Sequence, residues 1–182
     1  MRKVSFAMAV FFSSASYANG VPVFGLPLGG KLEAAVPVCP ADTSKQMKLC
    51  WVGKPYRAKD GSLLGSIRIE EKSLPLWAEY EIPRATISKD RILQYIEFPL
   101  SRRLYENKGK IVDSVSSRFG KPEAFDYKGT YSATWSNLPG VIKIGCINFQ
   151  CHLDILSEAE YKSREETMKA REERDRSKPS TL

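Results

Sequence analysis

Alternating apolar and polar positions along much of the chain predict β-strands. In residues 63–69 the apolar side chains of Leu63, Ile67 and Ile69 fall on one face, opposite Arg68. A period of two is that of a strand with one buried face. The same pattern recurs and predicts strands at residues 24–28, 63–71, 76–82, 91–98, 131–135, 141–147 and 152–156.

The hydrophobic period changes from two to about 3.6 in residues 101–119, which predicts the main helix. Ser101 is a suitable N-cap and Gly120 a suitable C-cap for it. A shorter helix is predicted at residues 31–35. Together these elements predict an α+β domain, in which an antiparallel sheet of about five to seven strands carries one main helix on a face. The apolar stripe of that helix contains Leu104, Ile111, Val112, Val115 and Phe119.

The C-terminal segment has the pattern of a solvated helix. Ser157 and Glu160 form a capping box, and acidic residues repeatedly precede basic residues by four positions. Its larger apolar residues are Tyr161 and Met168, which are seven apart and would form a seam with a partner helix. The alternative is a charged helix without a partner, frayed over residues 178–182.

The N-terminal segment has the three parts of a secretory signal peptide. A basic start and an apolar stretch too short to span a bilayer lead to the small residues Ser16 and Ala18. A lipoprotein would need a cysteine just after the cut, but the first cysteine is Cys39. The predicted organisation is therefore a signal peptide at residues 1–18, one α+β domain at residues 19–156 and a charged helical tail at residues 157–182.

The charge of the chain is moderately basic, with 28 Lys and Arg residues against 21 Asp and Glu residues. Residues 157–182 are balanced, so the positive excess of the mature chain lies on residues 19–156. Basic side chains on an exported domain suit anionic glycan, lipid headgroups or an acidic protein. They are scattered, which argues against nucleic acid as a partner. The densest basic group contains Arg102 and Arg103 beside Glu106, a mixture typical of ordinary solvated surface.

An even number of cysteines in an exported chain predicts disulfide bonds. Pairing of sequence neighbours is favoured, because each pair brackets a plausible turn. A redox function would need Cys-X-X-Cys, and a zinc site would need more histidine than the single residue present. We therefore expect two structural disulfides, no metal and no cofactor. The favoured pairs are Cys39 with Cys50 and Cys146 with Cys151.

Candidate catalytic residues are few. His152 is the only histidine, and Asp154 is the acidic residue nearest to it in the sequence. No Gly-X-Ser-X-Gly, phosphate-binding glycine loop or His-Glu-X-X-His motif accompanies them. Glu79 and Glu81 would share a strand face, as glycosidase carboxylates do, but such pairs more often face solvent. An enzyme is therefore the less favoured class.

Aromatic residues are numerous for a chain of this length and indicate a contact surface. The predicted strands that carry Trp77 and Tyr95 have large side chains on both faces. A second layer of structure or a partner must therefore cover one of these faces. The predicted binding residues are Trp77, Tyr95, Arg102, Arg103, Tyr161 and Met168.

The whole pattern predicts a periplasmic or secreted protein that binds a protein partner in the cell envelope without catalysis. It would be an accessory of an envelope or secretion assembly, or an inhibitor of a secreted enzyme. Two alternatives stay open: a small periplasmic hydrolase that uses His152, and a basic domain that binds anionic glycan or lipid. No segment after the signal peptide is apolar enough to predict a membrane span.

Overall fold

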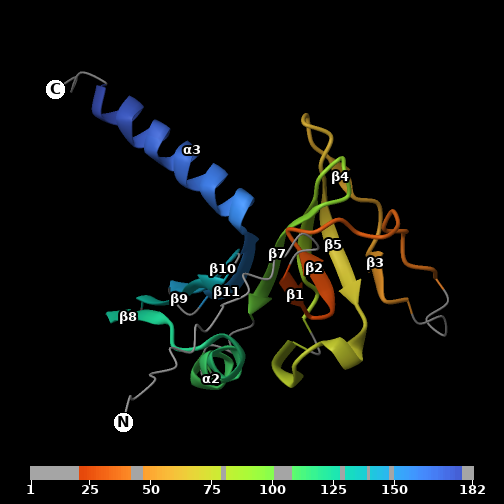
Figure 1. The fold of residues 1–182 in the computed structure, drawn as a ribbon, viewed down its shortest axis with the longest axis horizontal. Coiled ribbons are helices and arrows are strands. Elements are labelled where there is room, and N and C mark those ends of the chain that lie inside the picture. The colour runs from red at the N-terminus through yellow and green to blue at the C-terminus, as the bar shows by residue number, and fades with distance from the viewer. Residues whose placement is uncertain are drawn as a thin grey trace, which may run out of the picture.

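The chain forms one large sheet, with a helix packed on one face and a second helix leaving the other (Figure 1). The computed structural model describes residues 21–41, 47–78, 81–100, 108–127, 130–138, 140–147 and 150–177. The helices are α2 (Lys108–Phe119) and α3 (Glu158–Ser177), with two short 3-10 helices, η1 (Glu71–Ser73) and η2 (Leu76–Ala78). The strands are β1 (Val21–Val23), β2 (Leu26–Leu28), β3 (Leu49–Trp51), β4 (Tyr56–Arg57), β5 (Leu63–Ile69), β6 (Arg84–Ile87), β7 (Leu93–Leu100), β8 (Glu123–Tyr127), β9 (Thr130–Leu138), β10 (Gly140–Ile147) and β11 (Gln150–Ser157).

Eight strands follow one another across the sheet in the order β3-β5-β6-β7-β11-β10-β9-β8. Strand β4 pairs with β5, and β1 forms a hairpin with β2. Strand β2 joins β7 through one parallel pair, Leu28 with Leu93, whereas the other pairs of named strands are antiparallel. The pairing of β7 with β11 holds the two halves of the sheet together, with Phe98 opposite Leu153.

The sheet is larger than predicted, with eleven strands instead of five to seven. The sequence did not predict β1, β3, β4, β6 or β8. Strand β8 illustrates the reason: residues 123–126 are all exposed, so the strand has no alternation of buried and exposed positions that a sequence pattern could reveal. Strand β4 has two residues, and both are exposed.

Two predicted elements are wrong. Residues 76–82 were expected to form a strand, but η2 occupies the start of this segment, and the N–H of Ala78 bonds to the Pro75 carbonyl at 2.8 Å. Residues 31–35 were expected to form a helix, yet the N–H of Leu32 bonds to the Arg91 carbonyl at 2.8 Å. So short a helix is marginal by itself, and bonds to a neighbouring hairpin replace it.

One face of the sheet carries the hydrophobic core. On β11 the buried side chains of Leu153 and Ile155 point to this face, while His152 is exposed on the other. The register places Leu153 beside Phe98 of β7 and Ile144 of β10, so buried side chains form rows across the strands. Burial of a side chain of this size stabilises the fold by about 1.5–3 kcal/mol.

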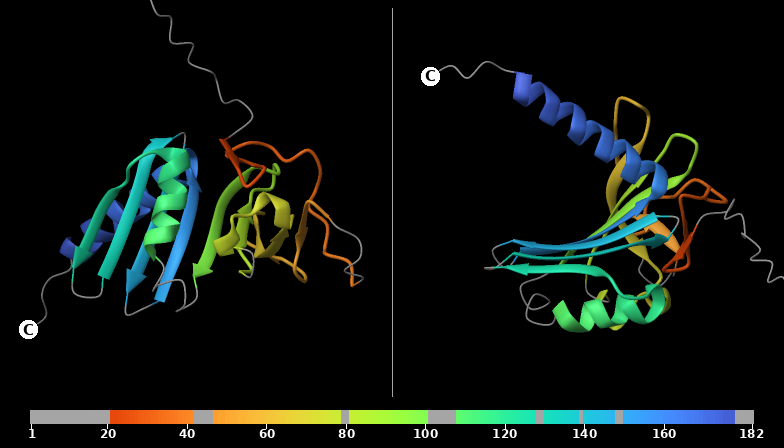
Figure 2. Two further views of the ribbon diagram at one scale, coloured as in Figure 1. Left: turned by 90° about the horizontal axis from the view of Figure 1, so that it is seen from below. Right: turned by 60° about the vertical axis from the view of Figure 1, so that its left-hand side comes forward.

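Helix α2 packs on the core face of the sheet (Figure 2). Its buried residues are Ile111 and Val115, two members of the predicted stripe. Gly120 follows the helix with a φ of 83°, as expected for the predicted C-cap. The indole N–H of Trp135 donates to the Gly120 carbonyl at 2.8 Å and ties the helix end to β9. The predicted N-cap, Ser101, lies outside the described residues.

Helix α3 leaves the opposite face and projects away from the body of the protein (Figures 1 and 2). The Oγ of Ser157 accepts a hydrogen bond from the N–H of Glu160 at 3.3 Å, as predicted for the N-cap. None of the 20 helical residues is buried. No helix in the described ranges has the length and apolar character needed to cross a bilayer. Ion pairs four residues apart join Glu158 to Lys162 at 2.5 Å, Glu160 to Arg164 at 2.7 Å and Glu172 to Arg176 at 4.0 Å.

The two disulfide bonds pair the cysteines as predicted. Cys39 and Cys50 join the segment before β3 to that strand, with a Cα–Cα distance of 4.9 Å. Cys146 and Cys151 are directly opposed on β10 and β11, 4.0 Å apart at Cα, and both are buried. Disulfide bonds of this kind are typical of proteins in an oxidising compartment.

Candidate functional site

A cleft of about 260 Å³ opens between α2, the two 3-10 helices and the turn that joins β1 to β2. Its floor is the core face of the sheet, formed by Ile142 of β10 with Leu153 and Ile155 of β11. We call this feature the aromatic cleft. Its walls include three aromatic and three polar residues: Phe24, Trp77 and Phe119, with Ser73, Ser114 and Arg118.

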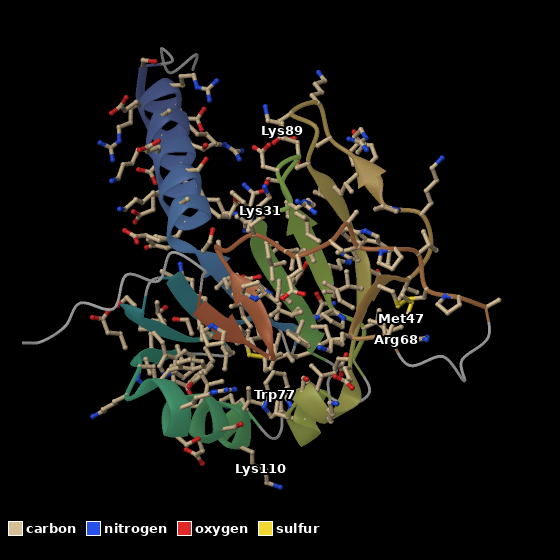
Figure 3. All side chains as sticks on the ribbon, turned by 45° about the vertical axis from the view of Figure 1, so that its right-hand side comes forward. Lys31, Met47, Arg68, Trp77, Lys89 and Lys110 are labelled. Carbon is tan, nitrogen blue, oxygen red and sulfur yellow. A yellow bond between two sulfur atoms is a disulfide. The ribbon has the colours of Figure 1, made fainter. Side chains whose placement is uncertain are left out.

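Trp77, one of the predicted binding residues, lies in the wall of the aromatic cleft. Figure 3 shows it between α2 and the 3-10 helices. Its ring meets Phe98 edge to face at a centroid distance of 5.6 Å, and Phe24 at 6.3 Å. Its indole N–H donates to the Oγ of Ser114 at 3.4 Å, which connects η2 to α2. Trp77 is therefore held from both sides of the cleft while its ring stays half-buried.

Phe24 occupies an unusual backbone position in the turn between β1 and β2. Its φ of 50° and the Gly25 φ of 74° are both positive, as in type I′ turns, where Asn-Gly is a usual pair. A left-handed conformation costs a non-glycine residue about 1–2 kcal/mol. Edge-to-face contacts with Trp77 and Phe98 offset this cost and hold the ring of Phe24 at the cleft.

The polar groups of the aromatic cleft are two hydroxyls and one cation. Arg118 is exposed, and its guanidinium carbon lies 5.9 Å from the centre of the Phe119 ring. No acidic side chain is among the described lining residues. The cleft therefore offers apolar surface beside hydrogen-bonding groups and a positive charge, which suits an apolar group next to an acceptor or a carboxylate.

Tyr95, a second predicted binding residue, lies on the opposite face of the sheet at the base of α3. Its hydroxyl donates a hydrogen bond to Asp154 of β11. The guanidinium carbon of Arg164 lies 4.1 Å from the centre of its ring. Burial, and then the hydrogen bond to Asp154, raises the pKa of Tyr95 above its ordinary value of 10.0. Through these contacts Tyr95 attaches α3 to the sheet.

Tyr161 and Met168, two more of the predicted binding residues, lie on α3 in different surroundings. The Tyr161 hydroxyl donates to Glu165 at 3.0 Å, and the Lys143 ammonium of β10 lies 5.8 Å from its ring centre. Met168 is 62% exposed further along α3. Tyr161 therefore contacts the sheet through Lys143, while Met168 stays accessible, and the seam with a partner helix stays a prediction.

The candidate catalytic pair lies on the exposed face of β11. Nε2 of His152 is 3.4 Å from Oδ2 of Asp154. The imidazole lies over Gly145, where a Cβ atom would come within 3.2 Å of Nε2. In the part of the chain that the structure describes, no serine or threonine hydroxyl is hydrogen-bonded to His152. That same part contains no group of three metal-ligating side chains.

Several sequence predictions lie outside the described residues, whereas the aromatic cleft itself was not predicted. The signal for Phe24 was its position before a glycine between two short apolar runs, which is a hairpin pattern. Ser114 gave no signal, because it lies on the polar side of the α2 stripe. The predictions outside the described residues concern residues 1–18 and 178–182, Glu79, Arg102 and Arg103.

Comparison of the chain with protein-family models, with curated proteins and with solved structures finds no match. Its function must therefore be argued from the geometry described above.

Proposed function

We propose that this chain is an exported, non-catalytic binding protein whose aromatic cleft receives an apolar side chain of a protein partner. The observation that carries this proposal is the arrangement of Phe24, Trp77 and Phe119, three half-buried rings around one open cleft. Aromatic residues that line a depression are characteristic anchors of protein interfaces. The hydroxyls and the cation at the cleft would fix the orientation of the bound segment.

The dimensions of the cleft suit one large side chain. Its volume of about 260 Å³ equals that of roughly nine water molecules in the liquid. The apolar floor favours a leucine, methionine or phenylalanine side chain, whereas Arg118 favours an acidic neighbour through a charge-assisted hydrogen bond. The partner segment that we propose therefore carries a large apolar residue beside an acidic one.

The cell envelope or the secreted fraction is the proposed setting for this interaction. The two disulfide bonds support an oxidising compartment, and the pattern of residues 1–18 supports export through a signal peptide. A binding protein there would serve as an accessory of an envelope or secretion assembly, or as an inhibitor of a secreted enzyme.

A cleft-filling variant tests the proposal. Ser114 is exposed on α2 beside Trp77, so Ser114→Phe places a ring in the cleft without removing a core side chain. The oxidised mature protein and this variant would each be cross-linked in an envelope extract, with Met168→Ala as control. Met168 is exposed on α3, away from the cleft.

We expect a protein that cross-links to the wild type and to Met168→Ala but not to Ser114→Phe. All three proteins should unfold cooperatively, with a slightly lower thermal midpoint for Ser114→Phe because the hydrogen bond from Trp77 is lost. A second variant, Arg118→Glu, should weaken the same cross-link by reversing the charge at the cleft. Cross-linking that is unchanged in both cleft variants would contradict the proposal.

A further inference from the structure

A second cavity, of about 300 Å³, lies beneath residues 32–36 and is separate from the aromatic cleft. It is bounded by the loop between β4 and β5 and by the hairpin loop between β6 and β7. Its apolar wall includes Leu63, Ile87 and Val36. Three cationic residues also line it: Arg57, Lys89 and Arg91. No acidic side chain is among its described lining residues, so its charge is positive.

Arg91 is held at this cavity in a conformation that favours glycine. Its φ is 68°, at the end of a tight hairpin loop in which its N–H bonds to the Ser88 carbonyl at 3.0 Å. Such a conformation costs a non-glycine residue about 1–2 kcal/mol. Its Nη1 donates to the Glu33 carbonyl at 3.1 Å, which sets the guanidinium across the cavity wall. Strained residues of this kind are concentrated at functional sites.

The other two cationic residues, Arg57 and Lys89, both lie beside Gly61 in the β4–β5 loop. Lys89, labelled in Figure 3, lies over Gly61, where an added Cβ would be 3.4 Å from the lysine Cβ. Nη1 of Arg57 is 3.4 Å from the Gly61 carbonyl. The Oδ1 atom of the nearby Asp60 accepts hydrogen bonds from the N–H and hydroxyl of Ser62 at 3.0 and 2.6 Å, and these bonds, with a smaller contribution from Lys89, lower the pKa of Asp60. Within the described ranges, none of the three cations has a carboxylate within 4.0 Å.

Trp51 contributes aromatic surface to the wall of this cavity. It lines the cavity and is 1% exposed, and its Nε1–H has no hydrogen-bond partner. Its ring lies against Gly65, where a Cβ atom would be 3.2 Å away. A buried donor without an acceptor costs about 1–3 kcal/mol, so such donors are rare without a reason.

We propose that this cavity binds a small organic anion, a carboxylate or phosphate that carries a compact apolar group. Arg57, Lys89 and Arg91 bind the anionic head, and the bound ligand lies against the side chain of Trp51. The apolar group lies on Leu63 and Ile87. A volume of about 300 Å³ corresponds to roughly ten non-hydrogen atoms at about 30 Å³ for each water-sized group. A free solute and a lipid headgroup share this chemistry.

The indole N–H signal of Trp51 reports directly on the site, because Trp51 lines the cavity. The chain has three tryptophans, so Trp51→Phe identifies the signal of Trp51 in a ¹⁵N correlation spectrum. Phenyl phosphate is the probe for a free solute, and phosphatidylglycerol vesicles, compared with phosphatidylcholine vesicles, are the probe for a headgroup. We expect saturable movement of the Trp51 signal by phenyl phosphate, with a Kd on the order of 1 mM or tighter.

Arg91→Gly is the decisive variant, because it removes the guanidinium and relieves the backbone strain. It should weaken phenyl phosphate binding about tenfold or more, as expected for loss of a charge-assisted hydrogen bond. Lys59→Ala removes one positive charge from the exposed β4–β5 loop at a residue that does not line the cavity, and should change the Kd less than about twofold. Lys89→Ala should behave like Arg91→Gly.

Three results would overturn the proposal. The first is no movement of the Trp51 signal when phenyl phosphate is added. The second is equal weakening of phenyl phosphate binding by Arg91→Gly and Lys59→Ala, which would indicate unspecific charge attraction. The third is sedimentation of the protein with phosphatidylglycerol vesicles that Arg91→Gly leaves unchanged. If Arg91→Gly instead abolishes this sedimentation, the result would support the cavity and identify a headgroup as the ligand source.

Discussion

The guanidinium carbon of Arg164 lies 4.1 Å from the centre of the Tyr95 ring, so a cation–π contact attaches the first turns of α3 to strand β7. Arg164 also pairs with Glu160 at 2.7 Å within the helix. The same tyrosine donates its hydroxyl hydrogen to Asp154. Because α3 has no buried residue, these few polar contacts determine how firmly its base is held.

Removal of the Arg164 side chain should loosen this attachment. We expect Arg164→Ala to lower the free energy of unfolding by about 0.5–1 kcal/mol, the usual range for a partly exposed cation–π contact. Amide exchange in the first turns of α3 should become faster. Arg171→Ala is the matched control, since Arg171 is 80% exposed and lies 4.0 Å from its ion-pair partner. Equal effects of the two substitutions on exchange at the helix base would refute this account.

The raised pKa of Tyr95 predicts a dependence of stability on pH. In the unfolded chain this phenol titrates near 10.0, whereas burial and Asp154 keep it protonated to higher pH in the folded protein. The stabilisation is therefore complete below pH 10 and is lost as the pH rises above it. Urea unfolding across this range should show a smaller alkaline loss in Tyr95→Phe than in the wild type. Parallel curves for the two proteins would argue against it.

Two glycines should respond in opposite directions to alanine. A Cβ at Gly140 would lie 2.6 Å from the Leu156 carbonyl oxygen, which is backbone of the paired strand and cannot turn away. We expect Gly140→Ala to destabilise the protein by about 1–3 kcal/mol or more. Gly109 in α2 has open space around the same position. Gly109→Ala should therefore stabilise the helix by up to about 1 kcal/mol. Thermal midpoints that move in the same direction in both variants would contradict this prediction.

The disulfide bonds should differ in their contribution to stability. In the chain-entropy model, the Cys39–Cys50 loop contributes about 3 kcal/mol and the shorter Cys146–Cys151 loop about 2 kcal/mol. Double alanine variants of each pair should follow this order in urea unfolding. A larger loss for the second pair would show that packing of its buried sulfur atoms outweighs loop length.

Sequence patterns correctly predicted the elements that bury one face and that begin or end at a recognisable capping residue. Ile111 and Val115 of α2, the Gly120 cap and the Ser157 cap all lie where predicted. The same reasoning failed where an apolar residue is buried without regular alternation. Trp77 follows a strand-like pattern, but tertiary contacts with Phe24 and Phe98 hold its segment in a 3-10 turn.

The candidate site was predicted even less completely, because it depends on contacts between distant segments. Trp77 and Ser114 are 37 residues apart and meet only after α2 has packed on the sheet. The second cavity likewise depends on the positive φ of Arg91, and no local pattern around this residue indicates a binding site. Side-chain type suggested binding residues, but long-range packing determines which of them share a surface.

Strand β8 ends the sheet at one side and pairs with β9 alone among the named strands. Its outer backbone groups are the kind of edge onto which a second copy of a chain can add a strand. Glu123 and Asp126 are exposed on this short strand. Two molecules that meet through this edge would bring like charges together, so electrostatic repulsion opposes the addition of a second copy to the sheet.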